Sequence, residues 1–153
     1  TVDEVLEAFN HWNVQEFDEV VFCGFGEPTE RLDTLLTVAE YVKKTFHKPT
    51  RVNTNGLANL IHGKDVTPLF KDRIDTISIS LNTPNAKRYY ELTRSKFGER
   101  SFDEMLKFAH DVKQYVPNVV LSTVSTTLTE QEEAQCKKIC DDLGVTYRIR
   151  PFE

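Results

Sequence analysis

The stretch VVFCGFGEPTERLD, residues Val20–Asp33, decides the fold, because a strand pattern changes there into a helical one. Its first residues are β-branched or aromatic, as in a buried strand. Two glycines and Pro28 follow, and from Leu32 onward the apolar residues recur at helical spacing. A strand, a tight turn and a helix in this order form the repeating unit of an α/β fold with parallel strands.

The rest of the chain repeats this alternation. Strands are predicted at 19–23, 50–55, 74–82, 118–126 and 145–151. Helices are predicted at 1–13, 31–46, 84–93, 102–115 and 129–143. A further short helix is expected to begin at Thr67-Pro68, because proline suits the first helical position. We therefore predict a single α/β domain over residues 1–153.

The predicted helix ends carry capping signals. A Ser or Thr followed three residues later by Glu is typical of a helix start, and it occurs at Thr1/Glu4, Ser101/Glu104 and Thr129/Glu132. Gly144 is suited to end the last helix. The elements begin with a helix and end with a strand, so a strand that should open the first unit is expected to be missing. We expect the domain to be incomplete at its N-terminal end.

Composition restricts the class of protein. The chain has 153 residues and a formal net charge of −5, with Lys and Arg spread along its length, so nucleic acid is not indicated as a partner. No apolar run is long enough to span a membrane and no signal peptide is recognisable, which predicts a cytoplasmic protein.

Three cysteines do not make a disulfide framework. Cys136 and Cys140 share an apolar helix face with Ile139 and Leu143, so we expect them in the core. The four histidines show no ligand-like spacing. No metal site is predicted in this chain.

Polar residues gather where the predicted strands end. The segments at these ends are Cys23–Pro28, Asn53–Gly56, Ser80–Asn82, Ser125–Thr127 and Arg150–Pro151. The carboxyl ends of parallel strands meet at one rim, where α/β proteins bind their ligands. The sequence therefore predicts a site for a polar, multidentate small molecule.

The GFGEP segment has two interpretations. Gly24 and Gly26 leave backbone groups accessible, and Pro28 stiffens the turn. Glu27 offers only acceptors, which suits an ammonium group on a ligand. Alternatively, the segment is an ordinary turn in which Glu27 caps the next helix.

Four segments in chain order resemble the radical S-adenosylmethionine enzymes. GFGEP is similar to the GGEP-type motif of that family, and the other three segments are VNTNG (52–56), ISISLN (77–82) and YRIRPF (147–152). Residues 51–68 further resemble small TatD-linked members. The resemblance implies a partial (β/α)6 TIM-like barrel of parallel strands, with the first strand and the cluster loop missing from this chain.

The resemblance also implies a function and a site. The cofactors would be S-adenosylmethionine and a [4Fe–4S] cluster, and reductive cleavage would give a 5′-deoxyadenosyl radical that acts on an unknown substrate. Gly24, Gly26, Glu27 and Pro28 would lie at the methionine amino end.

The later segments would hold the rest of the cofactor. Thr54 and Asn55 would lie near it, and Ser80 and Asn82 would approach its ribose or its carboxylate. Arg94 would pair with the carboxylate, or it is a solvated surface arginine; both interpretations stay open. No catalytic acid, base or nucleophile is identified.

One feature departs from the family. Its cluster is bound by a CxxxCxxC loop, and this chain has none, so the ligand cysteines are expected in the full-length protein. We expect the chain alone to be inactive and to bind S-adenosylmethionine weakly.

The alternative function is that of a cluster-less module that binds S-adenosylmethionine, a nucleotide or a partner. A lyase or aldolase would need a strand-end lysine, which is absent. A protein partner or a second copy is expected to cover the open barrel edge.

Overall fold

The computed structural model describes residues 2–11, 18–23 and 26–152. Its strands are β1 (Val20–Phe22), β2 (Thr50–Thr54), β3 (Thr76–Ser80), β4 (Asn118–Val124) and β5 (Thr146–Arg150). Its α-helices are α1 (Val2–His11), α2 (Leu32–Phe46), α3 (Ala58–His62), α4 (Ala86–Thr93), α5 (Ser101–Val112) and α6 (Glu130–Leu143). Short 3₁₀ helices lie at η2 (Pro28–Arg31), η3 (Thr67–Phe70) and η4 (Gly98–Arg100). None of the described helices is long and apolar enough to cross a lipid bilayer.

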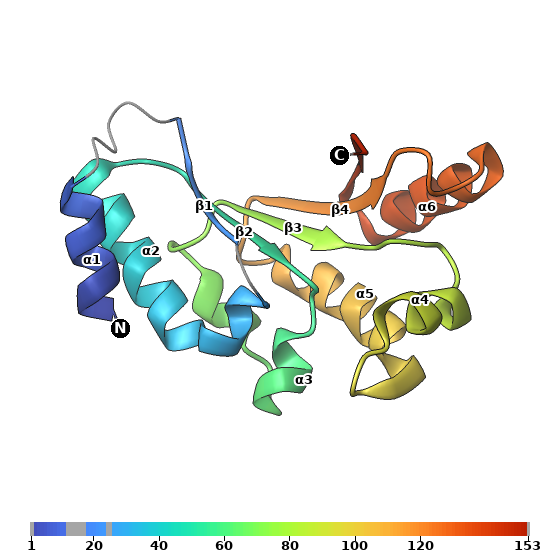
Figure 1. Ribbon diagram of the computed structural model, residues 1–153, viewed down its shortest axis with the longest axis horizontal. Helices are drawn as coiled ribbons and strands as arrows, with labels where there is room; N and C mark the ends of the chain where they lie inside the picture. The colour runs from blue at the N-terminus through green and yellow to red at the C-terminus, as the bar shows by residue number, and fades with distance from the viewer. Residues whose placement is uncertain (1, 12–17, 24–25, 153) are drawn as a thin grey trace.

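The five strands form one parallel sheet in the order β1-β2-β3-β4-β5. Sequential order with parallel strands is the arrangement of a TIM-like barrel wall, and it confirms the predicted α/β class. In Figure 1, α2, α3 and α5 lie together below the strands. Each strand begins and ends within two residues of its predicted limits.

The strand register separates two faces of the sheet. One row across the sheet joins Phe22, Val52, Ile77 and Val119. These side chains belong to the hydrophobic core or pack against it, together with residues of α2 and α5. The opposite face carries the alternate residues, which are mostly polar. Among the residues that the structure describes, the helices therefore cover one face of the sheet and leave the other without a helical layer.

The structure confirms the capping signals that the sequence predicts at both ends of α6. Thr129 and Glu132 form the predicted capping box of α6, and Gly144 ends that helix with φ of 74°. The predicted cap at Ser101 is wrong, because η4 runs directly into α5 and makes Ser101 its first residue. Its hydroxyl instead donates to the carbonyl of Gly98 at 2.8 Å. Thr1 lies outside the described residues.

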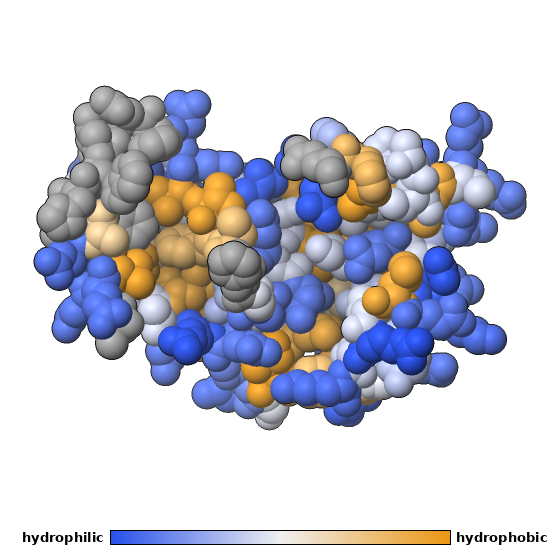
Figure 2. All heavy atoms as spheres, in the orientation of Figure 1, coloured by the Kyte–Doolittle hydropathy of each residue, from blue (hydrophilic) through white to orange (hydrophobic). Residues whose placement is uncertain are grey.

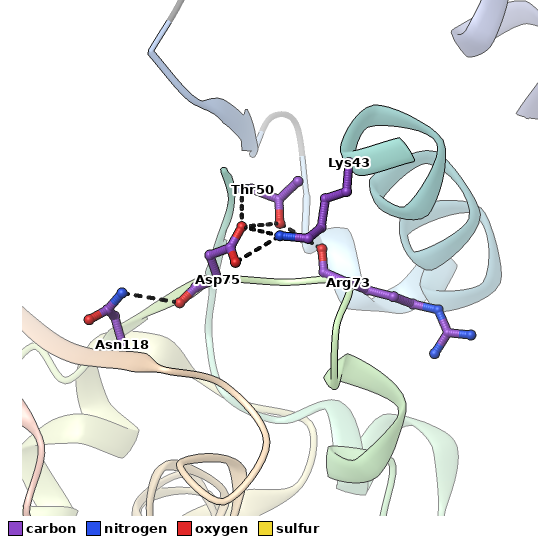
Figure 3. A network of polar contacts seen from close by, with 5 residues as sticks. All are labelled: Lys43, Thr50, Arg73, Asp75 and Asn118. Atoms are coloured by element: carbon purple, nitrogen blue, oxygen red, sulfur yellow. Dashed lines mark hydrogen bonds and ion pairs between the residues drawn. The ribbon is translucent and has the colours of Figure 1, made fainter. Parts of the chain in front are cut away.

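Asp75 ties the amino ends of the strands together (Figure 3). Its carboxylate accepts hydrogen bonds from Lys43 Nζ on α2 and from the backbone N–H of Thr50, each at 2.8 Å. Its carbonyl accepts the backbone N–H of Asn118 at 3.1 Å. Asp75 therefore fixes α2, β2 and β4 against β3 at the end opposite the rim, which is a structural role.

Replacing Asp75 with alanine is expected to lower the free energy of unfolding by about 1–3 kcal/mol, because two charged hydrogen bonds are lost at a half-exposed site. Urea titration followed by circular dichroism measures the change. Asp142→Ala is the matched control, since Asp142 forms an exposed ion pair with Lys138 on α6, and its loss should cost under about 0.5 kcal/mol. Equal losses in both variants would contradict the role given to Asp75.

Candidate functional site

Glu27 lies at the β1 end of the rim and is the N-cap of η2. Gly26 before it has φ of 85°, a conformation that favours glycine. The Glu27 carboxylate caps η2 by accepting the backbone N–H of Thr29 at 3.0 Å, and the Thr29 hydroxyl also donates to it. The capping interpretation of the turn is therefore confirmed.

The same carboxylate joins the ends of β1 and β2. Its Oε2 accepts the hydroxyl of Thr54 at 2.6 Å, and its Oε1 accepts the backbone N–H of Asn55 at 2.7 Å. Oε1 has this single hydrogen bond among the described residues, so it keeps acceptor capacity. Capping and ligand binding are thus compatible for Glu27.

The loop after β2 is held rigidly. Thr54 is buried, and its hydroxyl also accepts the backbone N–H of Gly56 at 3.1 Å. The side-chain carbonyl of Asn55 accepts the backbone N–H of Leu57 at 3.0 Å. Thr54 therefore holds Glu27 from the buried side of the rim, while the side chain of Asn55 is partly exposed.

Four of the predicted site residues line one open pocket of about 320 Å³, namely Asn55, Ser80, Asn82 and Arg94. Asn82 follows β3 with φ of 67°, and Arg94 ends α4 with φ of 50°. Such left-handed conformations are uncommon outside glycine and tend to occur at functional sites. Three different segments are brought together here.

Three further members of the predicted set, Gly26, Glu27 and Pro28, line a neighbouring pocket of about 510 Å³ along β1. Thr54 lines neither of these two pockets and contacts Glu27 instead, and Gly24 lies outside the described residues. Glu30 lines both pockets. Much of the larger pocket is apolar, and Figure 2 shows an apolar patch over β1 and α2. There Val21, on the edge strand β1, is 41% exposed.

The electrostatics of the two pockets differ in sign along the rim. Glu27 and Glu30 place carboxylates at one end, and Arg94 places a guanidinium at the other. Tyr89 lines the smaller pocket and is buried; burial, and then the Glu27 charge, raise the pKa of its hydroxyl to about 12. The tyrosine therefore stays neutral. The arrangement offers acceptors for a cation, a partner for an anion, and neutral hydrogen-bonding groups between them.

Sequence reasoning missed two supports of this rim. Thr29 is fully buried and holds Glu27, and its position two residues after the glutamate was an available signal for such a cap. The second is His62, whose Nε2 lies 2.7 Å from the carbonyl of Thr29. This contact joins α3 to η2. Because His62 and Thr29 are 33 residues apart in the chain, no local sequence pattern predicts it.

No group of three or more His, Cys, Asp or Glu side chains suited to a metal ion occurs within residues 2–11, 18–23 and 26–152. Cys136 and Cys140 are fully buried on α6, as predicted. Burial raises the pKa of their thiols to about 11 and about 12. Both are therefore neutral thiols packed in the core.

Thiol labelling tests this difference between the cysteines. At pH 8 the folded protein is expected to be modified at exposed Cys23 and to be protected at Cys136 and Cys140, because thiolates are the reactive form. Mass spectrometry of the digested protein locates the labels, and labelling in urea, where all three sites should react, is the control. Labelling of Cys136 in the folded protein at the rate of Cys23 would contradict the burial.

A family model described as the Radical SAM superfamily matches residues 1–143. No curated protein sequence matches the chain significantly.

Solved structures of similar fold were also found. SuiB of Streptococcus suis has a TM-score of 0.71 at 16% identity, covering 99% of this chain and 33% of SuiB. Its structure bound to S-adenosylmethionine has the same TM-score and identity, and the match covers 34% of that chain. TYW1 with a lysine-pyruvate adduct has a TM-score of 0.59 at 17% identity, covering 90% of this chain and 43% of TYW1. The chain thus spans about a third of the length of SuiB, and the likeness shows the shared fold.

Proposed function

Because this chain belongs to the radical S-adenosylmethionine superfamily, we propose that its strand-end rim binds S-adenosylmethionine. The observation that carries the proposal is the convergence of Asn55, Ser80, Asn82 and Arg94 on one pocket beside Glu27. These groups are the donors and acceptors that a zwitterionic amino acid joined to a ribose requires.

The proposed orientation follows the charges. The ammonium group of the cofactor meets Oε1 of Glu27, with backbone groups of Gly24 and Gly26 around it and Pro28 stiffening the turn. The carboxylate meets Arg94, whose planar fork suits two oxygens. Ser80 and Asn82 approach the ribose. Support comes from the free acceptor capacity of Glu27 and from the exposure of Arg94 at the pocket wall.

The chain's own contribution is to hold and orient the cofactor. When bound beside a reduced cluster, S-adenosylmethionine supplies reductive cleavage of its sulfonium for radical chemistry. The described residues do not fit a cluster, so we propose that the CxxxCxxC ligands belong to another part of the full-length protein. Which branch of the family the chain represents, including a TatD-linked one, and its cytoplasmic location stay predictions.

The unpaired edge of β1 is proposed to be covered in the full-length protein. Val21 and the apolar pocket beside it would otherwise leave an exposed strand edge that invites aggregation. A further strand of the same protein, a partner or a second copy would satisfy this edge.

The full-length protein, reconstituted with iron and sulfide under anaerobic conditions, tests the proposal. With dithionite and S-adenosylmethionine it is expected to form 5′-deoxyadenosine, measured by liquid chromatography with mass spectrometry. A protein reconstituted without iron is the control. Binding of S-adenosylmethionine with no 5′-deoxyadenosine would favour the cluster-less binding module. Neither binding nor product would contradict the proposed function.

A further inference from the structure

The helix-free face of the sheet carries a second polar pocket, which shares Ser80 with the rim pocket. It has a volume of about 180 Å³ and contains side chains from all five strands or the residues beside them. Arg51, Arg148 and Arg150 are its basic residues and Glu19 is its acidic one. Three guanidinium groups against one carboxylate make this face basic, on a chain whose net charge is −5.

The arginines differ in their surroundings. Arg51 Nη1 lies 3.6 Å from a carboxylate oxygen of Glu19, so its charge is partly compensated. Arg148 and Arg150 are exposed, and neither forms an ion pair or a side-chain hydrogen bond within the described part of the chain. Arginine side chains lose considerable entropy when they are fixed. The two on β5 are therefore unused donors beside a polar pocket.

The strand geometry places the guanidinium groups of Arg148 and Arg150 on the same face, where both can contact one ligand. Arg148 and Arg150 are alternate residues of one strand, so they extend from the same face about 7 Å apart. Ser122 of β4 is the register partner of Arg148, and Ser80 of β3 is the partner of Ser122. A basic pair thus continues into a row of two hydroxyl groups. Ser122 is 2% exposed and donates to the carbonyl of Ile79 at 3.5 Å, whereas Ser80 is half-buried.

Protection of a sheet edge is the plain alternative, since β5 is an edge strand and charged residues discourage edge pairing. A charged side chain on either face of β5 would protect the edge equally well. Here both arginines project to the face without helices, while Ile149 between them is 43% exposed on the other. Edge protection alone leaves the shared pocket and its hydroxyl row unexplained.

We propose that Arg148 and Arg150 bind the anionic group, a carboxylate or a phosphate, of a second ligand on the helix-free face. The inference rests on the proposed function, because Ser80 lines both this pocket and the rim pocket. A ligand held at the arginines and extending along Ser122 and Ser80 ends beside the cofactor site. The substrate class is therefore a small acid or a phosphorylated molecule with further hydrogen-bonding groups.

Calorimetric titration of the full-length protein with inorganic phosphate, and separately with succinate, tests this inference in the presence of saturating S-adenosylmethionine. The double variant Arg148→Gln/Arg150→Gln is expected to bind the preferred probe at least about tenfold more weakly, because charged hydrogen bonds are lost. Arg148→Lys/Arg150→Lys keeps the charge without the fork, and we expect it to lose part of the affinity. Arg100→Gln, on the helical side, is the matched control and should bind as the parent does. Circular dichroism verifies folding of each variant.

The outcomes separate the possibilities. Binding of phosphate alone identifies a phosphorylated ligand, and binding of succinate alone identifies a carboxylic acid. Equal affinity in the parent and the double glutamine variant, binding of neither probe, or competition of the probe with S-adenosylmethionine would overturn the inference. Probe binding that depends on the arginines in a protein that fails to bind S-adenosylmethionine would support the anion site and refute the proposed function.

Discussion

Replacing Glu27 with glutamine is expected to weaken S-adenosylmethionine binding by the full-length protein about tenfold to a hundredfold. The substitution removes the charge proposed to meet the ammonium group, and a charged hydrogen bond contributes about 1.5–3 kcal/mol. It also turns an amide NH₂ toward donors, because the carboxylate accepts the N–H of Asn55 and the hydroxyl of Thr54. Both effects act on the same side chain.

Two measurements separate these effects. Calorimetry gives the affinity, and urea unfolding gives the stability cost of the disturbed contacts. Glu30→Gln is the matched control, since Glu30 is an exposed carboxylate three residues after Glu27 that lines the same larger pocket; the affinity of this variant should change less than about threefold. Unchanged affinity in Glu27→Gln would contradict the assignment of Glu27 to the cofactor.

Replacing Gly56 with alanine is expected to lower the free energy of unfolding by about 2–5 kcal/mol. Gly56 has φ of 77°, which costs an L-residue about 1–2 kcal/mol. Its new Cβ would also lie 2.8 Å from Cγ2 of Ile79 and 2.9 Å from Cγ of Met105, both buried. Overpacking of this kind costs a further 1–3 kcal/mol or so. Urea titration measures the loss.

Gly63→Ala is the matched control, because Gly63 has φ of 66° and nothing within 4 Å of an added Cβ. It should show only the conformational cost of about 1–2 kcal/mol. If both variants lost the same stability, the close approach of the β2–α3 loop to the core would be contradicted. That approach matters to the site, because it holds Asn55 in place on the rim.

The sequence predicted the sheet well because each strand carries its own signal. β-branched runs bounded by turn residues are local features, and the Thr129 capping box is local too. Ser101 failed as a cap because η4 precedes α5 without a break, so no extended residue separates them. Local pattern does not reveal whether a helix begins from extended chain or from another helical turn.

The sequence predicts which strand ends lie together but not the contacts between them, and the assignment of these residues to a cofactor stays a prediction. Parallel strands place their carboxyl ends together, and this rule is enough to group Asn55, Ser80 and Asn82 from the sequence. The bonds from Glu27 to Thr54 and Asn55 span β1 and β2 and depend on where one strand lies against the next. The face to which Arg148 projects is likewise fixed by register, since a shift of one residue reverses it.

Hydrogen exchange of the full-length protein with and without S-adenosylmethionine tests the central claim most directly. Mass spectrometry of peptides should show slower exchange at 26–31, 52–57 and 80–95, which form the strand-end rim. Peptides around Lys43–Thr50 and Arg73–Thr76, at the opposite end of the strands, should exchange as before. Protection at that opposite end, or no protection at the rim under saturating cofactor, would contradict the assignment of the rim to S-adenosylmethionine.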